Sequence, residues 1–222
     1  MQIFTYQPPN LPWLDLRYID RDIIVINKPS GLLSNPGIAD HTYDCALTRL
    51  QTLFSGTILV HRLDCATSGI MVFARNKKAE SHLKTQFQDR QTKKIYIAII
   101  QGILKDNKGE IHAAITPDRN NPPKQKIAAQ GEGKVATTYY KELVKGTNST
   151  LIELTPITGR THQLRIHMLS IGHPILGDDF YGTEASEQAA KRLQLHAQSL
   201  TFTHPYTTKE MTFKSSHSFS IE

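Results

Sequence analysis

The sequence contains only two cysteines, Cys45 and Cys65, and lacks a Cys-x-x-Cys pair. Small secreted domains that depend on disulfides carry many more cysteines, and cysteine-based zinc sites need closely spaced pairs. We therefore expect both thiols to be reduced, as in a protein of the cytoplasm.

Long apolar runs are also missing. No segment approaches the roughly 18 consecutive apolar residues of a membrane span. The N-terminus lacks the basic region and long apolar stretch of a secretory signal. Both absences favour a soluble protein located in the cytoplasm.

Nucleotide and metal motifs are absent as well. Without a Gly-x-Gly-x-x-Gly or Walker A sequence, a Rossmann or P-loop nucleotide site is disfavoured. His162 and His167 are five residues apart, which is off the i, i+4 spacing that places two metal ligands on one helix face. The histidines therefore do not predict a metal site, and His61 and His167 are interpreted as hydrogen-bonding residues.

What the chain does have is an excess of positive charge. The net charge is +6 and the isoelectric point about 9.3, which suits a polyanionic partner such as nucleic acid. Residues 117–134 form a long polar loop by prediction, and a loop of this length is usually functional or disordered. Each basic side chain is either a phosphate contact or an ordinary solvated charge, and the candidates are Lys28, Lys93, Lys94, Arg119, Lys124, Lys126 and Arg160.

Hydrophobic periodicity predicts an α+β protein of about 200 residues after an extended, proline-rich arm over residues 1–20. The strands come without regular βαβ alternation, which favours a large, mostly antiparallel sheet. The strands are expected at 23–26, within 57–74 on both sides of a turn, and at 95–100, 111–115, 135–143, 150–154, 199–203 and 211–214. Helices are expected at 40–54, from an N-cap at Asn76 to Lys93-Lys94, at 161–171 and at 184–195.

The stretch from His61 to Ile70 places a cation, Arg62, and a carboxylate, Asp64, at the bend between two apolar runs. Charges beside apolar runs are costly unless they are paired or used. In an extended strand, residues i and i+2 share a face, so both side chains are expected on the same side. From these residues alone, Asp64 could simply pair with Arg62 or cap the turn, in which Gly69 permits a positive φ.

Three motifs in order then carry a resemblance. His-Arg-Leu-Asp-x-x-Thr-Ser-Gly at 61–69, Lys-Lys-Ile-Tyr-Ile-Ala at 93–98 and Pro-Ile-Thr-Gly-Arg-Thr-His-Gln-Leu-Arg-Ile-His at 156–167 resemble the RluA-type pseudouridine synthases. His-Pro-Ile-Leu-Gly-Asp at 173–178 and Leu-His-Ala at 195–197 follow in the family's order. His61 stands where the related RsuA-type enzymes usually have glycine, so it favours the RluA type.

The resemblance implies the pseudouridine synthase fold, a large, mostly antiparallel bent sheet flanked by helices with a catalytic cleft. It implies one catalytic domain over residues 21–222, with no S4-like domain before it. We expect a monomer, because no exposed apolar seam is evident.

The same resemblance implies cofactor-independent isomerisation of uridine to pseudouridine. It assigns the catalytic carboxylate to Asp64, the cation that keeps this carboxylate charged to Arg165, and the ring that stacks on uracil and takes or relays a proton to Tyr96. It assigns base flipping to Arg62, with His61 nearby. The sequence leaves open whether Asp64 attacks the ribose, attacks the base or acts as a base.

Expected substrates are structured RNAs. The short length and the stretch Pro122-Pro123-Lys124-Gln125-Lys126 make the chain similar to family members that modify both 23S rRNA and a tRNA anticodon stem-loop. Two other hypotheses stay open: a non-catalytic RNA-binding protein of the same fold, and a nucleoside or glycoside hydrolase that uses Asp64 with water.

Overall fold

The computed structural model describes residues 6–221, and the chain divides into two compact units. Of the described residues, unit 1 contains 6–93 and 197–215, and unit 2 contains 94–196 and 216–221. The first five residues of the predicted N-terminal arm lie outside the described residues. Among residues 6–221, no helix is both long and apolar enough to cross a bilayer.

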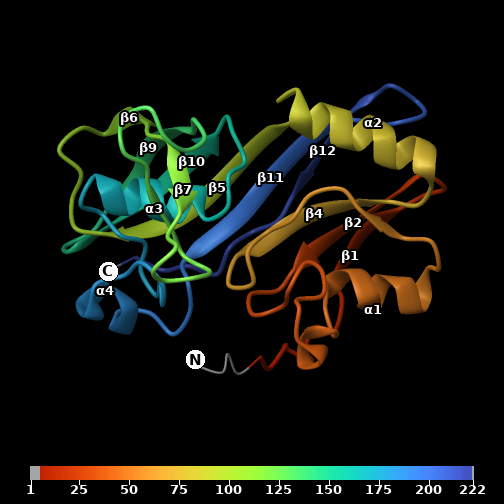
Figure 1. The fold of residues 1–222 in the computed structure, drawn as a ribbon, viewed down its shortest axis with the longest axis horizontal. Helices are drawn as coiled ribbons and strands as arrows, with labels where there is room; N and C mark the ends of the chain where they lie inside the picture. The colour runs from red at the N-terminus through yellow and green to blue at the C-terminus, as the bar shows by residue number, and fades with distance from the viewer. Residues whose placement is uncertain (1–5, 222) are drawn as a thin grey trace. The chain divides into compact units, whose positions relative to one another are not determined.

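Unit 1 is built on a sheet in which β1, β2, β4 and β11 are neighbours in that order (Figure 1). In the same sheet, β3 pairs with β4 and β12 pairs with β11. The β1–β2, β2–β4, β3–β4 and β11–β12 pairs are antiparallel. The strands are β1 (Leu16–Ile19), β2 (Ile23–Lys28), β3 (Ile58–Leu59), β4 (Ser68–Ala74), β11 (Leu195–Thr203) and β12 (Glu210–Lys214).

Helix α2 (Lys77–Gln88) covers one face of this sheet. It begins as predicted, because the Asn76 side chain accepts a hydrogen bond from the Ala79 amide at 2.9 Å. Ala79 and Leu83 are buried against β2, β4 and β11, with Phe87 beside them. The prediction that the helix continues to Lys93-Lys94 is wrong: it ends at Gln88, and the lysines open β5, where the β-branched run after them joins a sheet.

Helix α1 (Ala46–Leu53) is shorter than the predicted helix 40–54. Cys45 forms its N-cap, and a separate 3-10 turn at Asp40–Thr42 precedes it. Ala46 and Leu50 are buried, whereas Leu53 is exposed. The predicted helix was too long at its start, because the backbone of Cys45 is extended and the helix begins only after it.

The N-terminal arm is held on α1 by the buried side chain of Arg49. Its guanidinium donates to the carbonyls of Pro9 and Trp13, each at 2.8 Å, and lies 5.7 Å from the Trp13 ring. Burial raises the pKa of Tyr6 to about 12, and its hydroxyl donates to the Asp44 carbonyl. Residues 16–19 of the predicted arm are a strand of the sheet, β1, and not an extended arm.

Unit 2 contains a sheet in the order β5, β10, β9 and β6, and each of these pairs is antiparallel. This confirms the α+β, mostly antiparallel prediction. The predicted strand 111–115 is divided, because β6 ends at His112 and a separate strand begins at Ile115. The strands of this sheet are β5 (Lys93–Gln101), β6 (Lys108–His112), β9 (Thr137–Lys145) and β10 (Ser149–Pro156).

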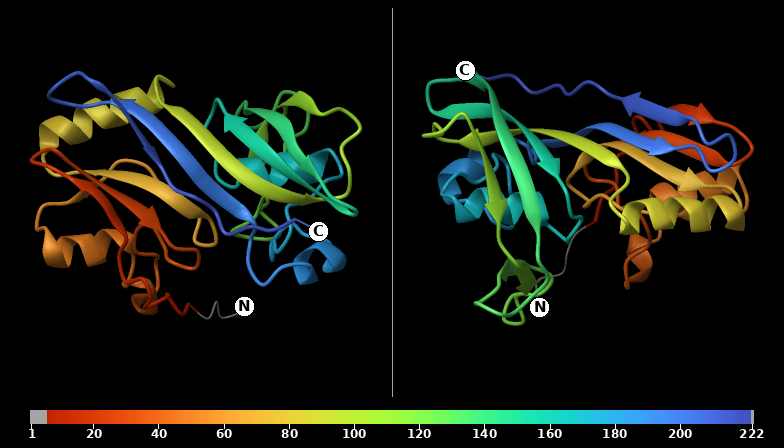
Figure 2. Two further views of the ribbon diagram at one scale, coloured as in Figure 1. Left: turned by 180° about the vertical axis from the view of Figure 1, so that it is seen from behind. Right: turned by 90° about the horizontal axis from the view of Figure 1, so that it is seen from above.

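A second, small sheet in unit 2 corrects the prediction of one long loop over 117–134. β7 (Ile115–Pro117) and β8 (Gln125–Ile127) form an antiparallel hairpin that projects from the unit (Figure 2). α3 (Gln163–Ser170) begins two residues later than predicted, after His162 at φ +56°, and α4 (Glu184–Gln188) is shorter than the predicted helix 184–195.

Candidate active site

His61, Arg62 and Asp64 lie in the loop that joins β3 to β4, not on a strand. The argument that Arg62 and Asp64 share a strand face is therefore wrong. Leu63 is buried and anchors the loop, while Arg62 is exposed and Asp64 is half-buried. The buried leucine thus separates an exposed cation from a half-buried carboxylate.

The segment after β2 fixes the backbone of this loop. The Ser34 hydroxyl donates to the Leu63 carbonyl at 2.6 Å and accepts from the Leu63 amide at 3.0 Å. The Ser30 hydroxyl donates to the Ala66 carbonyl at 2.7 Å. Side chains from residues 30–34 therefore hold the backbone on both sides of Asp64.

Lys28 belongs to the same support. Its side chain is fully buried, and its ammonium donates to the carbonyls of Pro29, Leu32 and Cys65 at 2.9, 2.6 and 3.1 Å. Three donors on one ammonium match three carbonyl acceptors. The expectation that Lys28 contacts RNA phosphate is therefore wrong, because its charged group faces the protein interior.

Gly69 is required by close packing within the sheet. Its φ is +123°, and a Cβ atom would lie 2.3 Å from the carbonyl oxygen of Ala197 in β11. Gly69 is part of β4, so the predicted tight turn is not its role. Only glycine allows the two strands to approach this closely.

His61 packs against α2. Its Nε2 accepts from the Val72 amide at 3.1 Å, and its ring stacks on Phe87 with 4.3 Å between centroids. His167 is fully buried. The Thr138 hydroxyl is hydrogen-bonded to its Nδ1 at 2.9 Å, and the Ala113 carbonyl accepts from its Nε2 at 3.1 Å. Burial lowers the pKa of His167.

Two of the predicted catalytic residues belong to unit 2. Tyr96 is half-buried in β5, opposite Leu154 of β10. Arg165 is in α3 with 3% of its side chain exposed, and it is paired with Asp178 at 2.6 Å. Asp178 ends the motif at 173–178, but the sequence predicts no role for it, because α3 and residue 178 meet only in the folded chain.

The start of α3 is organised by Thr158 and Gln163. The Gln163 carboxamide accepts from the Thr158 hydroxyl at 2.7 Å and donates to the Thr137 carbonyl at 2.9 Å. The neighbouring Arg160 donates from Nε to the Val135 carbonyl at 3.3 Å. These contacts tie the third sequence motif to β9.

The other predicted basic contacts differ in exposure. Arg119 and Lys126 are exposed on the β7–β8 hairpin, and Lys93 is exposed and pairs with Glu210. Lys124 is half-buried, and its ammonium donates to the Phe180 carbonyl at 2.6 Å. Lys94 approaches the Thr158 carbonyl at 3.4 Å.

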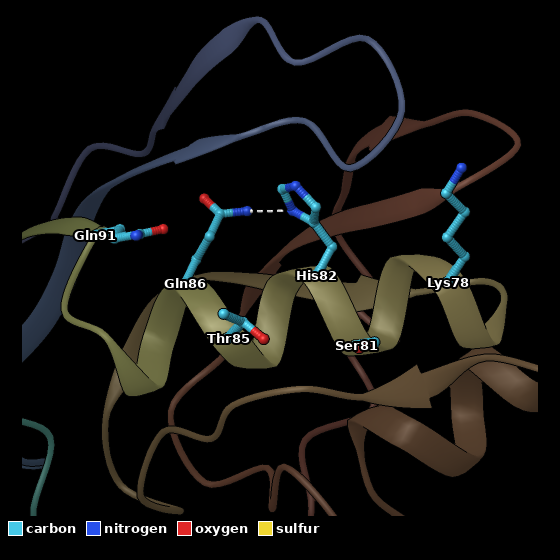
Figure 3. Close-up of a pocket in the computed structure, with 6 residues that line it drawn as sticks. All are labelled: Lys78, Ser81, His82, Thr85, Gln86 and Gln91. Carbon is cyan, nitrogen blue, oxygen red and sulfur yellow. Dashed lines mark hydrogen bonds between the residues drawn. The ribbon is translucent and has the colours of Figure 1, made fainter.

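A polar groove of about 510 Å³ lies along α2 in unit 1 (Figure 3). None of its lining residues is acidic, and each carries a hydrogen-bond donor. The Gln86 carboxamide contacts His82 and is bonded in both directions to the backbone of Thr203, so the groove wall is fixed. The lining residues are Lys78, Ser81, His82, Thr85, Gln86 and Gln91.

Within residues 6–221, one group of side chains has metal-like spacing: Asp20, Asp22 and His204. The Nδ1 atom of His204 accepts from the amides of Tyr206 and Thr207, so its Nε2 carries the proton and donates to Asp20 at 2.9 Å. Burial would raise the pKa of Asp20, but amide, tyrosine and histidine hydrogen bonds hold that pKa below its usual value. The group is a hydrogen-bonded turn and does not fit a metal.

Comparisons with known proteins identify the family of the chain. Residues 22–170 match the family described as RNA pseudouridylate synthase. A Haemophilus ducreyi protein named dual-specificity RNA pseudouridine synthase RluA is 48% identical, with 99% of this chain and 100% of that protein covered. The Escherichia coli protein of the same name is 46% identical over the same shares.

Solved structures of RNA pseudouridylate synthase domains also superpose on this chain. Human RNA pseudouridylate synthase domain containing 1 superposes with a TM-score of 0.81 at 28% identity, covering 96% of this chain and 87% of that one. Human RNA pseudouridylate synthase domain containing 4 gives a TM-score of 0.72 at 29% identity, covering 91% and 88%. The chain therefore belongs to the RNA pseudouridylate synthase family, whose members are isomerases that convert uridine in RNA into pseudouridine without a cofactor.

Proposed function

We propose that this enzyme has dual specificity and modifies a uridine in 23S rRNA and a uridine in a tRNA anticodon stem-loop. The observation that carries this proposal is the 48% identity, over nearly the full length of both chains, to a relative named as dual-specificity. Cytoplasmic location fits these RNA substrates. We propose further that residues 21–222 act as one catalytic domain and that the enzyme is a monomer.

Asp64 is the catalytic carboxylate in this proposal. The reaction breaks the bond between N1 of uracil and C1′ of ribose, forms a bond between C5 and C1′, and removes the proton from C5, while N1 takes up a proton, so that the product is an isomer of uridine. No electrons are gained or lost overall, so no redox partner is needed. The supports from Ser30 and Ser34 favour the role, because a reacting carboxylate needs a fixed position.

Three further side chains act with Asp64. Arg165 stabilises its negative charge, as a guanidinium does well because it stays ionised. Tyr96 stacks on the uracil ring and takes or relays the C5 proton. Arg62, exposed two residues before Asp64, enters the RNA stack when the target nucleotide is flipped out. His61 supports the loop through Val72 and Phe87 and does not need to touch the base.

RNA is held through its phosphates by exposed basic side chains. Arg119 and Lys126 on the β7–β8 hairpin fit this role, and Lys93 is exposed as well. Lys124 and Arg160 are half-buried and contribute further positive charge. Lys78 joins this set, because the donor-lined groove on α2 suits phosphate oxygens. Lys28 is excluded by its burial.

Tritium release tests the proposal directly. A tRNA anticodon stem-loop and a 23S rRNA fragment, each labelled at uracil C5, are incubated with purified protein in the absence of added cofactor or metal. We expect release of tritium to water from both RNAs and no free uracil. Release from one RNA would contradict dual specificity, and release of free uracil would indicate a hydrolase instead. Binding without release from either RNA would contradict catalysis.

A further inference from the structure

The carboxylate of Asp178 is buried and fully engaged in hydrogen bonds. It is 1% exposed, and its Oδ2 accepts from Nε of Arg165 at 2.8 Å. Its Oδ1 accepts from Nη2 of Arg165 at 2.6 Å and from the amides of Phe180 and Tyr181 at 3.0 Å each. A carboxylate offers about four acceptor positions, so this one is fixed in orientation by its partners.

The same loop also places two aromatic rings beside the Arg165 guanidinium. The Cζ atom of Arg165 lies 4.9 Å from the Phe180 ring centre and 5.1 Å from the Tyr181 ring centre. Aromatic faces attract a cation most strongly when it is shielded from water, and this guanidinium is almost fully buried. The bidentate carboxylate and the two rings together define the plane and the rotation of the guanidinium.

The donors that these acids use lie on one edge of the guanidinium. Asp178 takes Nε and Nη2, and Asp179 approaches Nη2 at 3.2 Å. The Nη1 edge points the other way by the planar geometry of the group. Anchoring one edge of an arginine therefore determines the direction of the other edge.

The backbone of the loop is itself constrained. A Cβ atom on Gly177, whose φ is +70°, would lie 2.1 Å from the Arg192 carbonyl oxygen. A Cβ atom on Gly182 would lie 2.4 Å from the carbonyl oxygen of Asp178. Two glycines thus allow the close turn that delivers Asp178 to α3.

We propose that Asp178 is a positioning residue for catalysis: it holds the Arg165 guanidinium in one orientation, with the Nη1 edge turned away from Asp178. The inference rests on the proposed role of Arg165. A buried ion pair is weak evidence for stability, because well-packed apolar residues often stabilise as much. A bidentate pair gives geometric precision that apolar packing does not, and precision is what a charge beside a reacting group needs.

The test compares Asp178→Asn with Asp179→Asn. Both variants remove one negative charge that contacts Arg165, but Asp179 is 58% exposed and makes a single contact. We expect Asp178→Asn to lower kcat by about 100-fold with KM nearly unchanged. Asp179→Asn is expected to lower kcat by less than about 5-fold. Equal effects of the two variants, or a loss confined to KM, would overturn the proposal.

A double-mutant cycle separates positioning from a general structural role. If Asp178 acts through Arg165, Asp178→Asn should cost little further kcat in an Arg165→Lys background. Additive losses would overturn the proposal, because they would show that Asp178 acts independently of Arg165.

Asp178→Glu covers the case in which Asp178→Asn does not fold. It keeps the charge pair but moves the carboxylate by one methylene, so we expect a folded protein whose kcat falls at least about 10-fold. Wild-type kcat in this variant would contradict positioning.

The Nε–H resonance of Arg165, identified by its loss in Arg165→Lys, provides a readout that needs no activity. We expect it to shift and exchange faster in Asp178→Glu, and an unchanged resonance would overturn the proposal. If wild-type protein releases no tritium while this resonance responds as expected, the failure lies in the proposed function and not in the pairing.

Discussion

The hydroxyl of Ser34 and the backbone of Leu63 are joined by two hydrogen bonds, one in each direction, at 2.6 and 3.0 Å. The amide and the carbonyl of Leu63 are both buried beneath the surface together with Ser34, which is 3% exposed. The residue after Leu63 is Asp64. A single hydroxyl thus fixes the backbone immediately before Asp64.

Replacing Ser34 with alanine should therefore weaken both folding and catalysis. Two buried backbone groups would lose their partner, which costs about 1–3 kcal/mol of unfolding free energy. Urea denaturation measures that loss, and kcat should fall because Asp64 is less well placed. Ser55→Ala, at an exposed site, is the control and should change the free energy by less than about 0.5 kcal/mol. Equal behaviour of the two variants would refute this role of Ser34.

Asp64→Asn should abolish turnover and leave folding and RNA binding largely intact. The substitution preserves shape but removes the negative charge and the nucleophilic or basic oxygen pair. Tritium release measures turnover, and a filter-binding titration with the same stem-loop measures affinity. Full activity in this variant would contradict the assignment of Asp64 as the catalytic carboxylate.

Arg62→Ala should reduce turnover on structured RNA more than on an RNA whose target uridine is already unstacked. The reason is that flipping costs a few kcal/mol for a stacked base and much less for a free one. The ratio of kcat/KM on a closed stem-loop to that on an open single strand is the quantity to compare with wild type. An equal loss on both RNAs would argue against a flipping role.

Lys126 and Lys28 should respond differently to salt. Lys126→Ala removes an exposed charge, so the slope of log Kd for RNA against log salt should decrease by about 1. Lys28→Met should leave this slope unchanged in the folded protein, because its ammonium is bonded to three carbonyls in the interior. A lower slope in Lys28→Met would indicate that the ammonium reaches the RNA.

His167 should make the protein less stable in acid. Burial lowers its pKa in the folded state, so the unfolded chain, with a pKa near 6.5, binds the proton first. The stability contributed by neutral His167 is present above about pH 6.5 and is lost as pH falls from there through the folded-state pKa, at up to about 1.4 kcal/mol per pH unit.

Denaturation midpoints between pH 7.5 and 5 measure this dependence. His167→Gln should flatten it, whereas His41→Gln, at an exposed site, should leave it as in wild type. An unchanged pH dependence in His167→Gln would show that His167 does not carry the effect.

The sequence alone determined the class of the fold and the family. The Asn76 cap, the β-branched run after Lys94 and the two strands that became β9 and β10 could be predicted, because caps and periodicity are local properties of the chain. The motifs at 61–69, 93–98 and 156–167 carried the family resemblance, because they occur in the family's order along the chain.

Only the tertiary structure decided how these residues are supported. Lys28 looked like a surface cation until the folded chain placed three carbonyls around its ammonium. Arg165 was assigned a role by resemblance alone, and only the folded chain shows that Asp178 and two rings, 13 to 16 positions later, enclose its guanidinium. Burial and pairing depend on which distant segments meet, and no local pattern records the partner that a charged side chain will find.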